Sequence, residues 1–375
     1  MKKLFIITGE YSGDRHAADV VREIKKINPE IQIEAVGGVN LANEGVKLYC
    51  DHSKMSAMGF NLKIILTHIN LGEKIAHYLK DKYKPDMVLL IDYGGFNLNL
   101  SKLLHKYGFK IYYYIPPQIW ASRKWRLNTV KKCINKVLTI FPFENEMYEK
   151  AGIDVEFVGH PLLAEMPDKF DKEKFFTENN LDKSKKLISI FPGSRTFEIN
   201  NLLKLFLDSA RIIKSKNKDV QFILCQAPNI KDSLINPIVD NYKDLNIRIM
   251  KNKNYELLSV SDALILASGT VALEAAIYGT PMIISYRGPW FLYGVYMLVR
   301  CIKRVCLPNI IMNQDIVPEI LQAKAKPSII ADNINKILEN DEYKNSMIKS
   351  LKNVKQKLST SNAAEKAAEI IVNNI

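Results

Sequence analysis

The 375 residues of this chain are 47% hydrophobic and 25% charged, and this length exceeds one ordinary domain and suffices for two packed cores. The formal net charge of +13 favours anionic partners such as nucleic acid, anionic lipid or phosphorylated substrates, although a solvated lysine-rich surface explains part of it. The five cysteines form no CxxC pair, which argues against a disulfide framework or structural zinc and predicts a reducing, cytoplasmic location.

The N-terminal segment begins with a basic residue pair and a short apolar run. The run reaches Gly9-Glu10 after only four apolar residues, so it predicts a first β-strand and not a signal peptide. No apolar run approaches the roughly 20 residues that a membrane-spanning helix needs. The longest one, 290–299, stops at Arg300.

Short apolar runs alternate with helix-length segments along the chain, as in strands buried in a parallel sheet that is covered on both faces. A first series of predicted strands is 3–8, 31–36, 87–92, 110–115, 136–141 and 155–158. A second series is 187–191, 220–225, 247–250, 263–267 and 282–286. The polar segment 166–186 between them is interpreted as a linker.

This pattern predicts an α/β protein with two doubly wound, Rossmann-like domains, 1–165 and 166–358, whose ligands bind at the carboxyl ends of the strands. The segment 359–375 is typical of a capped, alanine-rich helix. We expect this last helix to pack back on the first domain.

The loop after the first predicted strand, 9–14, reads Gly-Glu-Tyr-Ser-Gly-Asp, and a helix is expected from about Arg15. Small residues allow close approach to the backbone, and helix N-terminal amides attract anions or hydroxyl-rich ligands. The spacing is not GxGxxG, so a dinucleotide site is disfavoured, and an ordinary tight turn remains the alternative. The candidate contact residues are Glu10, Ser12, Gly13 and Asp14.

Asp92 ends the third predicted strand. A carboxylate at the carboxyl end of a buried strand faces the ligand side of the sheet, where burial sets the pKa that a general base requires. A loop-capping aspartate is the structural alternative. Trp120, in the proline-rich loop 116–123, is a candidate wall of the acceptor site or a core residue.

Two turns in the second predicted domain have the composition of phosphate sites. The first contains Gly193, Ser194 and Arg195, which offer backbone and hydroxyl donors and a planar guanidinium. The second contains Ser268, Gly269 and Thr270 before a helix whose N-terminal amides suit a diphosphate. Glu274, one turn into that helix, is either an acceptor for ribose hydroxyls or a partner of the helix dipole. Together the turns favour a nucleoside diphosphate site.

The order of these motifs over nearly the whole chain resembles the lipid-A-disaccharide synthases. The motifs that carry the resemblance are GExSGD at 9–14, PQIWA at 117–121, FPFE at 141–144, VGHP at 158–161, PGSR at 192–195, ASGT at 267–270 and LPN at 307–309. The resemblance implies a GT-B glycosyltransferase, inverting and independent of metal and other cofactors, with two Rossmann-like domains facing a cleft.

The resemblance also implies the reaction and its residues. UDP-2,3-diacylglucosamine and 2,3-diacylglucosamine 1-phosphate would give a β-1,6-linked disaccharide 1-phosphate and UDP. Asp92 would be the general base, Arg195 would be needed for activity, and Glu274 and Asn309 would lie in the UDP site. His16 is a rival base, because other GT-B enzymes place a histidine near this loop.

The chain departs from the family's usual sequence at two places. It has Asp-Tyr-Gly-Gly-Phe-Asn at 92–97 where the family usually has Asp-Ala-Pro-Asp-Phe-Asn, and Trp-Ala-Ser at 120–122 in place of Trp-Ala-Trp. The second acid is thus replaced by Gly95. Both changes flank the presumed acceptor pocket, where this chain is therefore expected to differ.

Two apolar segments are candidates for contact with lipid. The segment 58–79 predicts a helix too apolar to be exposed to water, so it is either buried or in contact with acyl chains. The segment 290–299, between Arg287 and Arg300, combines aromatic residues with cations, as in interfacial elements that lie on anionic lipid. These features and the resemblance predict peripheral association with the inner membrane.

Other interpretations remain open. A different UDP-sugar enzyme of the GT-B class, either a lipid-linked muramyl peptide transferase or a UDP-sugar epimerase, fits the same turns. A nucleic-acid-binding module fits the charge, but the chain has no recognisable binding motif, so no nucleic acid partner is expected. The oligomeric state is left open, with a homodimer as one option.

Overall fold

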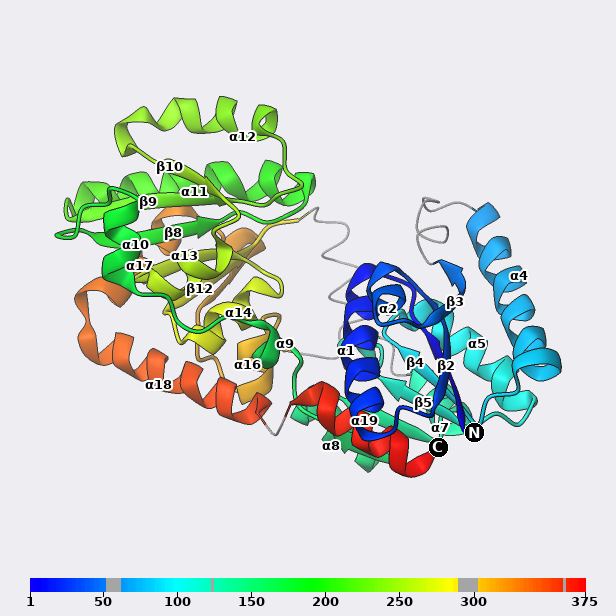
Figure 1. Cartoon of the computed structure of the whole chain (residues 1–375). Coiled ribbons are helices and arrows are strands. Elements are labelled where there is room, and N and C mark those ends of the chain that lie inside the picture. The colour runs from blue at the N-terminus through cyan, green and yellow to red at the C-terminus, as the bar shows by residue number, and fades with distance from the viewer. Residues whose placement is uncertain (52–61, 123–124, 289–302, 360–361) are drawn as a thin grey trace. The chain divides into compact units, whose positions relative to one another are not determined.

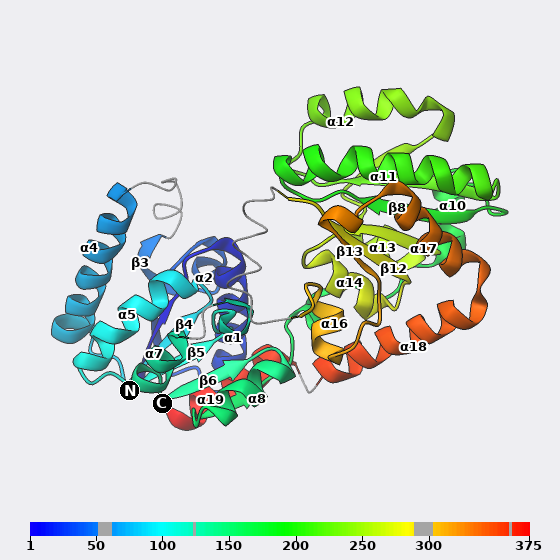
Figure 2. The same cartoon turned by 180° about the vertical axis from the view of Figure 1, so that it is seen from behind.

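A computed structural model describes residues 1–51, 62–122, 125–288, 303–359 and 362–375. The chain divides into two compact units, one made of Met1–Ala164 with Leu358–Ile375 and the other of Glu165–Lys357. Each unit is a parallel sheet with helices on both faces (Figures 1 and 2). The predicted fold, with two doubly wound α/β domains, is confirmed.

The N-terminal unit contains a seven-stranded sheet in the order β3-β2-β1-β4-β5-β6-β7, with every pairing parallel. The strands are β1 (Lys3–Ile7), β2 (Gln32–Gly37), β3 (Lys47–Asp51), β4 (Met87–Ile91), β5 (Ile111–Tyr114), β6 (Lys136–Thr139) and β7 (Val155–Phe157). The strand order reverses between β1 and β4. The loops that follow these two strands therefore meet at the edge where ligands bind in such folds.

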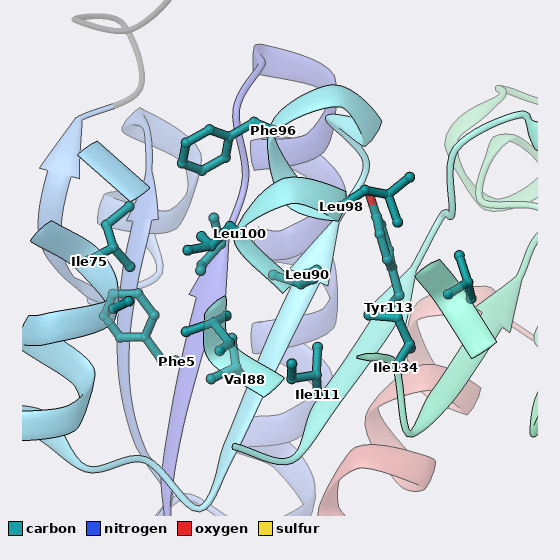
Figure 3. Packing of buried hydrophobic residues seen from close by; sticks show 14 of the residues in the cluster. Phe5, Ile75, Val88, Leu90, Phe96, Leu98, Leu100, Ile111, Tyr113 and Ile134 are labelled. Carbon is teal, nitrogen blue, oxygen red and sulfur yellow. The ribbon is translucent and has the colours of Figure 1, made fainter. Parts of the chain in front are cut away.

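The helices of this unit cover a sheet that is apolar on both sides. They are α1 (Tyr11–Ile27), α2 (Val39–Asn43), α4 (Leu62–Tyr78) with the π-helical turn Leu79–Tyr83, α5 (Gly94–Lys106), α6 (Ile119–Ser122), α7 (Arg126–Cys133), α8 (Pro142–Lys150) and α9 (Leu162–Glu165). Alternate residues of a strand point to opposite faces. Phe5, Val88 and Leu90 accordingly pack with Ile75 of α4 and Leu100 of α5 in one continuous core (Figure 3).

The last helix, α19 (Ala363–Asn374), packs against α1 of the N-terminal unit. Asn362 caps α19 by accepting a hydrogen bond from the Ala364 amide at 3.2 Å. Ala367, Ala368 and Ile371 are fully buried. The predicted return of the C-terminal helix to the first domain is thus confirmed.

The second unit contains a six-stranded parallel sheet in the order β10-β9-β8-β11-β12-β13. Its strands are β8 (Lys186–Phe191), β9 (Val220–Gln226), β10 (Arg248–Lys251), β11 (Ala263–Ala267), β12 (Met282–Tyr286) and β13 (Glu319–Leu321). Here the order reverses between β8 and β11. The loops after those strands carry the two turns that the sequence marks as phosphate sites.

The helices of the second unit are α10 (Lys172–Glu178), α11 (Thr196–Lys216), α12 (Asp232–Val239), α13 (Asn254–Val260), α14 (Val271–Tyr278), α16 (Leu307–Met312), α17 (Pro327–Glu339) and α18 (Asp341–Leu358), with short 3-10 helices at Asp240–Leu245 and Gln322–Lys324. Helices α11 and α17 pack together on one side of the sheet. Figure 2 shows α13 and α14 on the other side.

The structure corrects three details of the sequence prediction. Helix α1 begins at Tyr11 and not near Arg15, so Ser12 and Gly13 belong to its first turn. The predicted linker 166–186 contains α10, which Asp171 caps and which buries Phe175 and Phe176 in the second unit. The edge strands β3 and β13 are absent from the prediction because the first is only half-buried and the second has three residues.

Candidate active site

Asp92 lies directly after β4, at the carboxyl edge of the N-terminal sheet. Its backbone is left-handed, with φ of 50°, and neighbouring side chains hold its carbonyl oxygen. Asn97 Nδ2 donates to that oxygen at 2.8 Å and Tyr113 Oη donates to it at 2.7 Å. The structure therefore fixes the backbone of Asp92 while its carboxylate stays half-buried.

The electrostatics of Asp92 suit a proton acceptor. Burial raises its pKa above the ordinary aspartate value, and a hydrogen bond from the Tyr93 amide and the nearby charge of His16 partly offset this effect. His16 is half-buried on α1. The structure thus brings together the two residues that the sequence offers as rival bases, and a desolvated carboxylate with a raised pKa favours Asp92.

Backbone strain gathers at this edge of the sheet. Asp92, Tyr93 and Ile115 all have positive φ, between 49° and 54°, and β4 and β5, whose ends they follow, are neighbours. A left-handed conformation costs a residue other than glycine about 1–2 kcal/mol. Such strain is concentrated at functional sites, where surrounding contacts maintain it.

The loop after β1 approaches Asp92 closely. A Cβ at Gly13 would lie 3.6 Å from the Cβ of Asp92, so the space between the first turn of α1 and the end of β4 is about one methyl group wide. Glu10 and Ser12 are exposed in the same loop. Of the predicted contact residues in this loop, Gly13 lies next to Asp92, and contact of Glu10, Ser12 and Gly13 with an acceptor stays a prediction.

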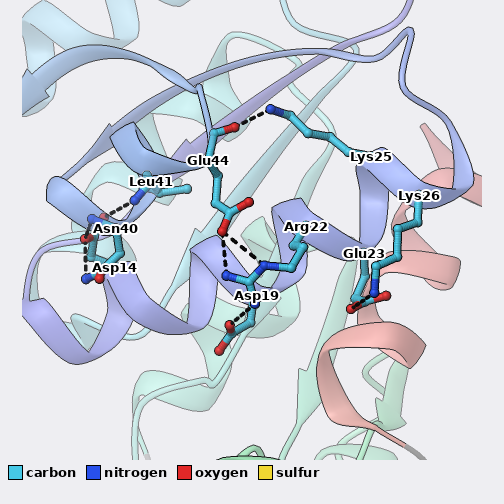
Figure 4. Close-up of polar contacts among 9 residues, drawn as sticks. All are labelled: Asp14, Asp19, Arg22, Glu23, Lys25, Lys26, Asn40, Leu41 and Glu44. Carbon is cyan, nitrogen blue, oxygen red and sulfur yellow. Dashed lines mark hydrogen bonds and ion pairs between the residues drawn. The ribbon is translucent and has the colours of Figure 1, made fainter.

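Asp14 has a different place in this loop. Its buried carboxylate accepts hydrogen bonds from the amides of Gly38 (2.6 Å) and Asn40 (2.9 Å) and from Asn40 Nδ2 (2.9 Å), and so caps α2 (Figure 4). The side chain is fully buried. The described contacts of Asp14 hold two segments of the fold together, and contact with a substrate stays a prediction.

Trp120 is buried and hydrogen-bonded within the N-terminal unit. Its Nε1 donates to Glu144 Oε1 at 2.8 Å, and its ring meets that of Phe143 edge-on at 5.0 Å between centroids. Burial raises the pKa of Glu144 to about 8. These contacts agree with the core interpretation of Trp120, and its role as a wall of the acceptor site stays a prediction.

In the second unit, the turn after β8 is organised by Glu198. The Glu198 carboxylate accepts hydrogen bonds from the amides of Ser194 (2.8 Å) and Arg195 (3.2 Å). Gly193 has φ of 113°, and a Cβ there would lie 2.3 Å from Glu198 Oε2. The two amides are therefore already satisfied. The Arg195 guanidinium lies 3.4 Å from the same carboxylate, at Glu198 Oε1, while the Arg195 side chain is 81% exposed.

The turn after β11 meets the turn after β8 in one cavity of about 250 Å³. Every predicted UDP-site residue of the two turns, with Glu274, lines this cavity: Gly193, Ser194, Arg195, Ser268, Gly269, Thr270 and Glu274. The N-terminus of α14 contributes the positive end of its dipole. Arg195 adds a cation beside the carboxylates of Glu198 and Glu274, and it is the group of this cavity that suits a phosphorylated ligand.

Asn309 does not line this cavity. It is fully buried on α16, where its Nδ2 donates to Val317 O and to Glu319 Oε1, both at 2.9 Å, and its Oδ1 accepts from the amides of Ile316 and Val317. Asn309 thereby fixes the chain that leads into β13. Its contact with UDP stays a prediction.

Three polar residues of this region carry no signal in the sequence. Cys225 and Asn254 line the cavity, with the Cys225 thiol 3.0 Å from Asn254 Oδ1. Burial, then the charges of Glu256 and Glu274, raise the pKa of Cys225 to about 12. Asn229 Nδ2 donates to Ser194 O at 2.6 Å. Cys225 lies on β9, Asn229 lies in the loop after that strand, and Asn254 begins α13, so their separation in the sequence hides that they meet here.

The apolar segments have unequal outcomes. In the segment 58–79, helix α4 begins at Leu62. Its residues Ile75 and Ala76 are fully buried against the sheet, whereas Ile69 is 54% exposed. Residues 58–61 and the whole segment 290–299 lie outside the described residues. Within the described parts of the chain, no helix has the length and apolar character needed to cross a bilayer.

Comparison with known proteins decides the family. The model of the lipid-A-disaccharide synthetase family matches residues 4–372. The chain belongs to this family. The lipid-A-disaccharide synthase of Geobacter sulfurreducens is 33% identical to it over 99% of this chain and 96% of that protein. The lipid-A-disaccharide synthase of Coxiella burnetii is also 33% identical, over 100% of this chain and 99% of that protein.

Solved structures share the fold at lower identity. A UDP-GlcNAc 2-epimerase from Neisseria meningitidis, bound to UDP-GlcNAc, has a TM-score of 0.62 at 16% identity and covers 100% of this chain and 99% of its own. A glycosyltransferase from Rickettsia africae has a TM-score of 0.62 at 18% identity, covering 100% and 98%. This chain thus has a GT-B-like architecture, as predicted. The prediction that it is a glycosyltransferase of lipid A biosynthesis is also confirmed.

Proposed function

We propose that the protein transfers a diacylglucosamine from UDP to 2,3-diacylglucosamine 1-phosphate, with inversion at the anomeric carbon. One observation supports the donor above all others, namely the cavity in which Arg195 and the N-terminus of α14 converge. A nucleoside diphosphate satisfies this combination of one cation and the positive end of a helix dipole. Glu274, which lines the same cavity, is the proposed acceptor of hydrogen bonds from ribose hydroxyls.

Asp92 is the proposed base. As the primary hydroxyl oxygen of the acceptor bonds to the anomeric carbon, the hydroxyl proton passes to the Asp92 carboxylate. The bond from the anomeric carbon to the diphosphate breaks, and UDP takes the electron pair. Arg195 and the α14 amides stabilise the charge that develops on the leaving UDP. These protein groups stabilise the leaving group without a metal in the proposed scheme.

The deciding experiment is mass analysis of the product from UDP-2,3-diacylglucosamine and 2,3-diacylglucosamine 1-phosphate. We expect a tetraacyl disaccharide 1-phosphate, and UDP in equal amount. Donor without acceptor is the control, because an epimerase would convert UDP-sugar without releasing UDP. Equal UDP release with an unacylated acceptor would contradict the proposed lipid acceptor.

The protein is proposed to meet its acylated substrates at the anionic inner-membrane surface. The net charge of +13 and the exposed Ile69 on α4 support a peripheral contact. We expect co-sedimentation with vesicles containing phosphatidylglycerol that weakens as salt rises. Equal recovery in the supernatant with and without anionic vesicles would contradict the contact.

A further inference from the structure

Tyr93, the residue after the proposed base, has a side chain enclosed by three elements. A Cβ at Gly9, in the loop after β1, would lie 2.1 Å from Tyr93 Cδ1, so the ring occupies the space that only glycine leaves free. On α5, the Phe96 ring centroid lies 5.8 Å from that of Tyr93. On α4, His68 Nε2 is 2.7 Å from Tyr93 Oη, at hydrogen-bond distance.

The hydrogen bond between Tyr93 and His68 joins the end of β4 to α4. His68 is half-buried, and its ring meets that of Phe96 edge-on at 5.7 Å. Tyr93 is half-buried as well. Both partners of the hydrogen bond are therefore held in place by packing, and the pair forms a fixed link between α4 and the Asp92 turn.

The backbone explains why this link matters for Asp92. Asp92 and Tyr93 have φ of 50° and 49°, and two consecutive left-handed residues other than glycine tend to relax toward ordinary conformations. Tyr93 shares a peptide bond with Asp92. A change in the Asp92 torsions would move the Tyr93 ring away from Gly9 and break its hydrogen bond with His68.

We propose that Tyr93 and His68 are positioning residues, which through their hydrogen bond hold Asp92 in the conformation that accepts the acceptor proton. This inference rests on the proposed function, in which Asp92 is the base. The pair opposes relaxation of the left-handed turn and so keeps the Asp92 carboxylate in its partly desolvated position.

Other titratable groups also face this turn. His16 of α1 acts on Asp92 through its charge, and Tyr113 of β5 donates to the Asp92 carbonyl. Burial and the nearby Glu10 raise the pKa of Tyr93, so its hydroxyl stays protonated at neutral pH. A test of the pair must therefore leave His16, Glu10 and Tyr113 unchanged.

The test is a double-mutant cycle in the full-length enzyme, with kcat and KM measured from UDP release. Tyr93→Phe removes only the hydroxyl, and we expect kcat to fall roughly 3- to 10-fold, the effect of one lost hydrogen bond, with KM for both substrates changed less than about twofold. His68→Leu should have the same effect. The double variant should be no slower than either single variant, because the two changes remove one interaction.

Two further variants serve as controls. His68→Gln places an amide nitrogen near the position of Nε2, and we expect it to restore kcat to within about twofold of the wild type. Tyr78→Phe also removes a tyrosine hydroxyl from α4, where Tyr78 Oη donates to Glu34 Oε2 at 2.6 Å. That variant should change thermal stability and leave kcat unchanged.

A measurement independent of turnover separates this inference from the proposed function. Carbon-13 NMR of the Asp92 carboxyl in Tyr93→Ala should show a lower pKa than in the wild type, because a relaxed turn lets the carboxylate reach water. If Asp92→Asn retains turnover, the base assignment fails while this titration still tests the pair. An unchanged Asp92 pKa, a wild-type kcat in Tyr93→Phe, or losses that multiply in the double variant would each overturn the inference.

Discussion

The Asp92 turn of the N-terminal unit and the Arg195 cavity of the second unit have opposite electrostatic requirements. Asp92 is half-buried in a strained turn, and burial raises its pKa. The Arg195 side chain is 81% exposed in the cavity that the N-terminus of α14 also lines. A base needs partial desolvation to hold a proton near neutral pH, whereas a site for a diphosphate needs accessible positive charge.

The two sites also differ in how their backbones are fixed. At Asp92, side chains from neighbouring strands and helices hold the carbonyl oxygen. At Arg195, a single carboxylate, Glu198, holds the amides of the turn. The comparison shows that similar strand-to-helix loops serve either proton transfer or anion binding, depending on which groups the fold leaves exposed.

The largest expected effect tests the first site. Asp92→Asn keeps the shape of the side chain and removes its basicity, so kcat should fall about 10²- to 10⁴-fold with little change in donor binding. UDP release measures the rate and calorimetry with UDP measures binding. In the wild type, activity should fall on the acid side at a pH above about 4, because the pKa of Asp92 is raised. Retained turnover would move the role of base to another residue such as His16.

A smaller effect is expected at the second site. Arg195→Ala should lower kcat about 10²-fold, because a charge that stabilises the leaving UDP is lost, and calorimetry should show weaker UDP binding. Lys204→Ala, on the helix that follows Arg195 and paired with Asp208, is the matched control. Equal UDP affinity in the wild type and Arg195→Ala would show that the exposed guanidinium does not serve the cavity.

The smallest expected effect is on stability and concerns Glu144, a carboxyl buried in the core. Burial raises the pKa of both Glu144 and Asp92, but only Asp92 is at the candidate site. Burial raises the pKa of Glu144 to about 8, so above about pH 4 the folded state keeps a proton that the unfolded state releases. The wild type should therefore lose stability as pH rises from about 5 to 8, by at most about 1.4 kcal/mol per pH unit.

Glu144→Gln should remove this contribution to the pH dependence while its amide oxygen still accepts the hydrogen bond from Trp120. Urea unfolding at several pH values between about 5 and 8 measures it. Glu149→Gln, an exposed carboxylate on the same helix, is the control and should keep the wild-type slope. Identical slopes in both variants would show that Glu144 ionises normally in the folded protein.

Much of the fold followed from local pattern. Continuous apolar runs predict buried strands such as β8 and β11, and the small residues after them indicate the turns that line the cavity. Asp92 is a candidate base from the sequence because it is a single acid at the end of such a run. In each case the deciding signal lies within about ten residues of sequence, which is the range over which pattern determines structure.

The remaining features depend on contacts between distant segments. No local pattern shows that Asp14 caps α2, that Glu198 occupies the amides of Ser194 and Arg195, or that Tyr93 meets His68. The half-buried β3 and the short β13 also escaped prediction, because neighbouring strands stabilise them more than their own sequences do. Sequence reasoning thus indicated the loops of the candidate site but not the partners that fix them.

The packing of α19 on α1 has a consequence for biosynthesis. Residues 363–374 complete the N-terminal unit, yet the ribosome makes them only after the whole of the second unit, Glu165–Lys357. Until then the apolar surface of α1 that α19 covers stays open to water and to other chains. The second unit must therefore emerge, and has time to fold, before α19 can complete the core of the first. Docking of α19 is then the last step in the folding of the chain.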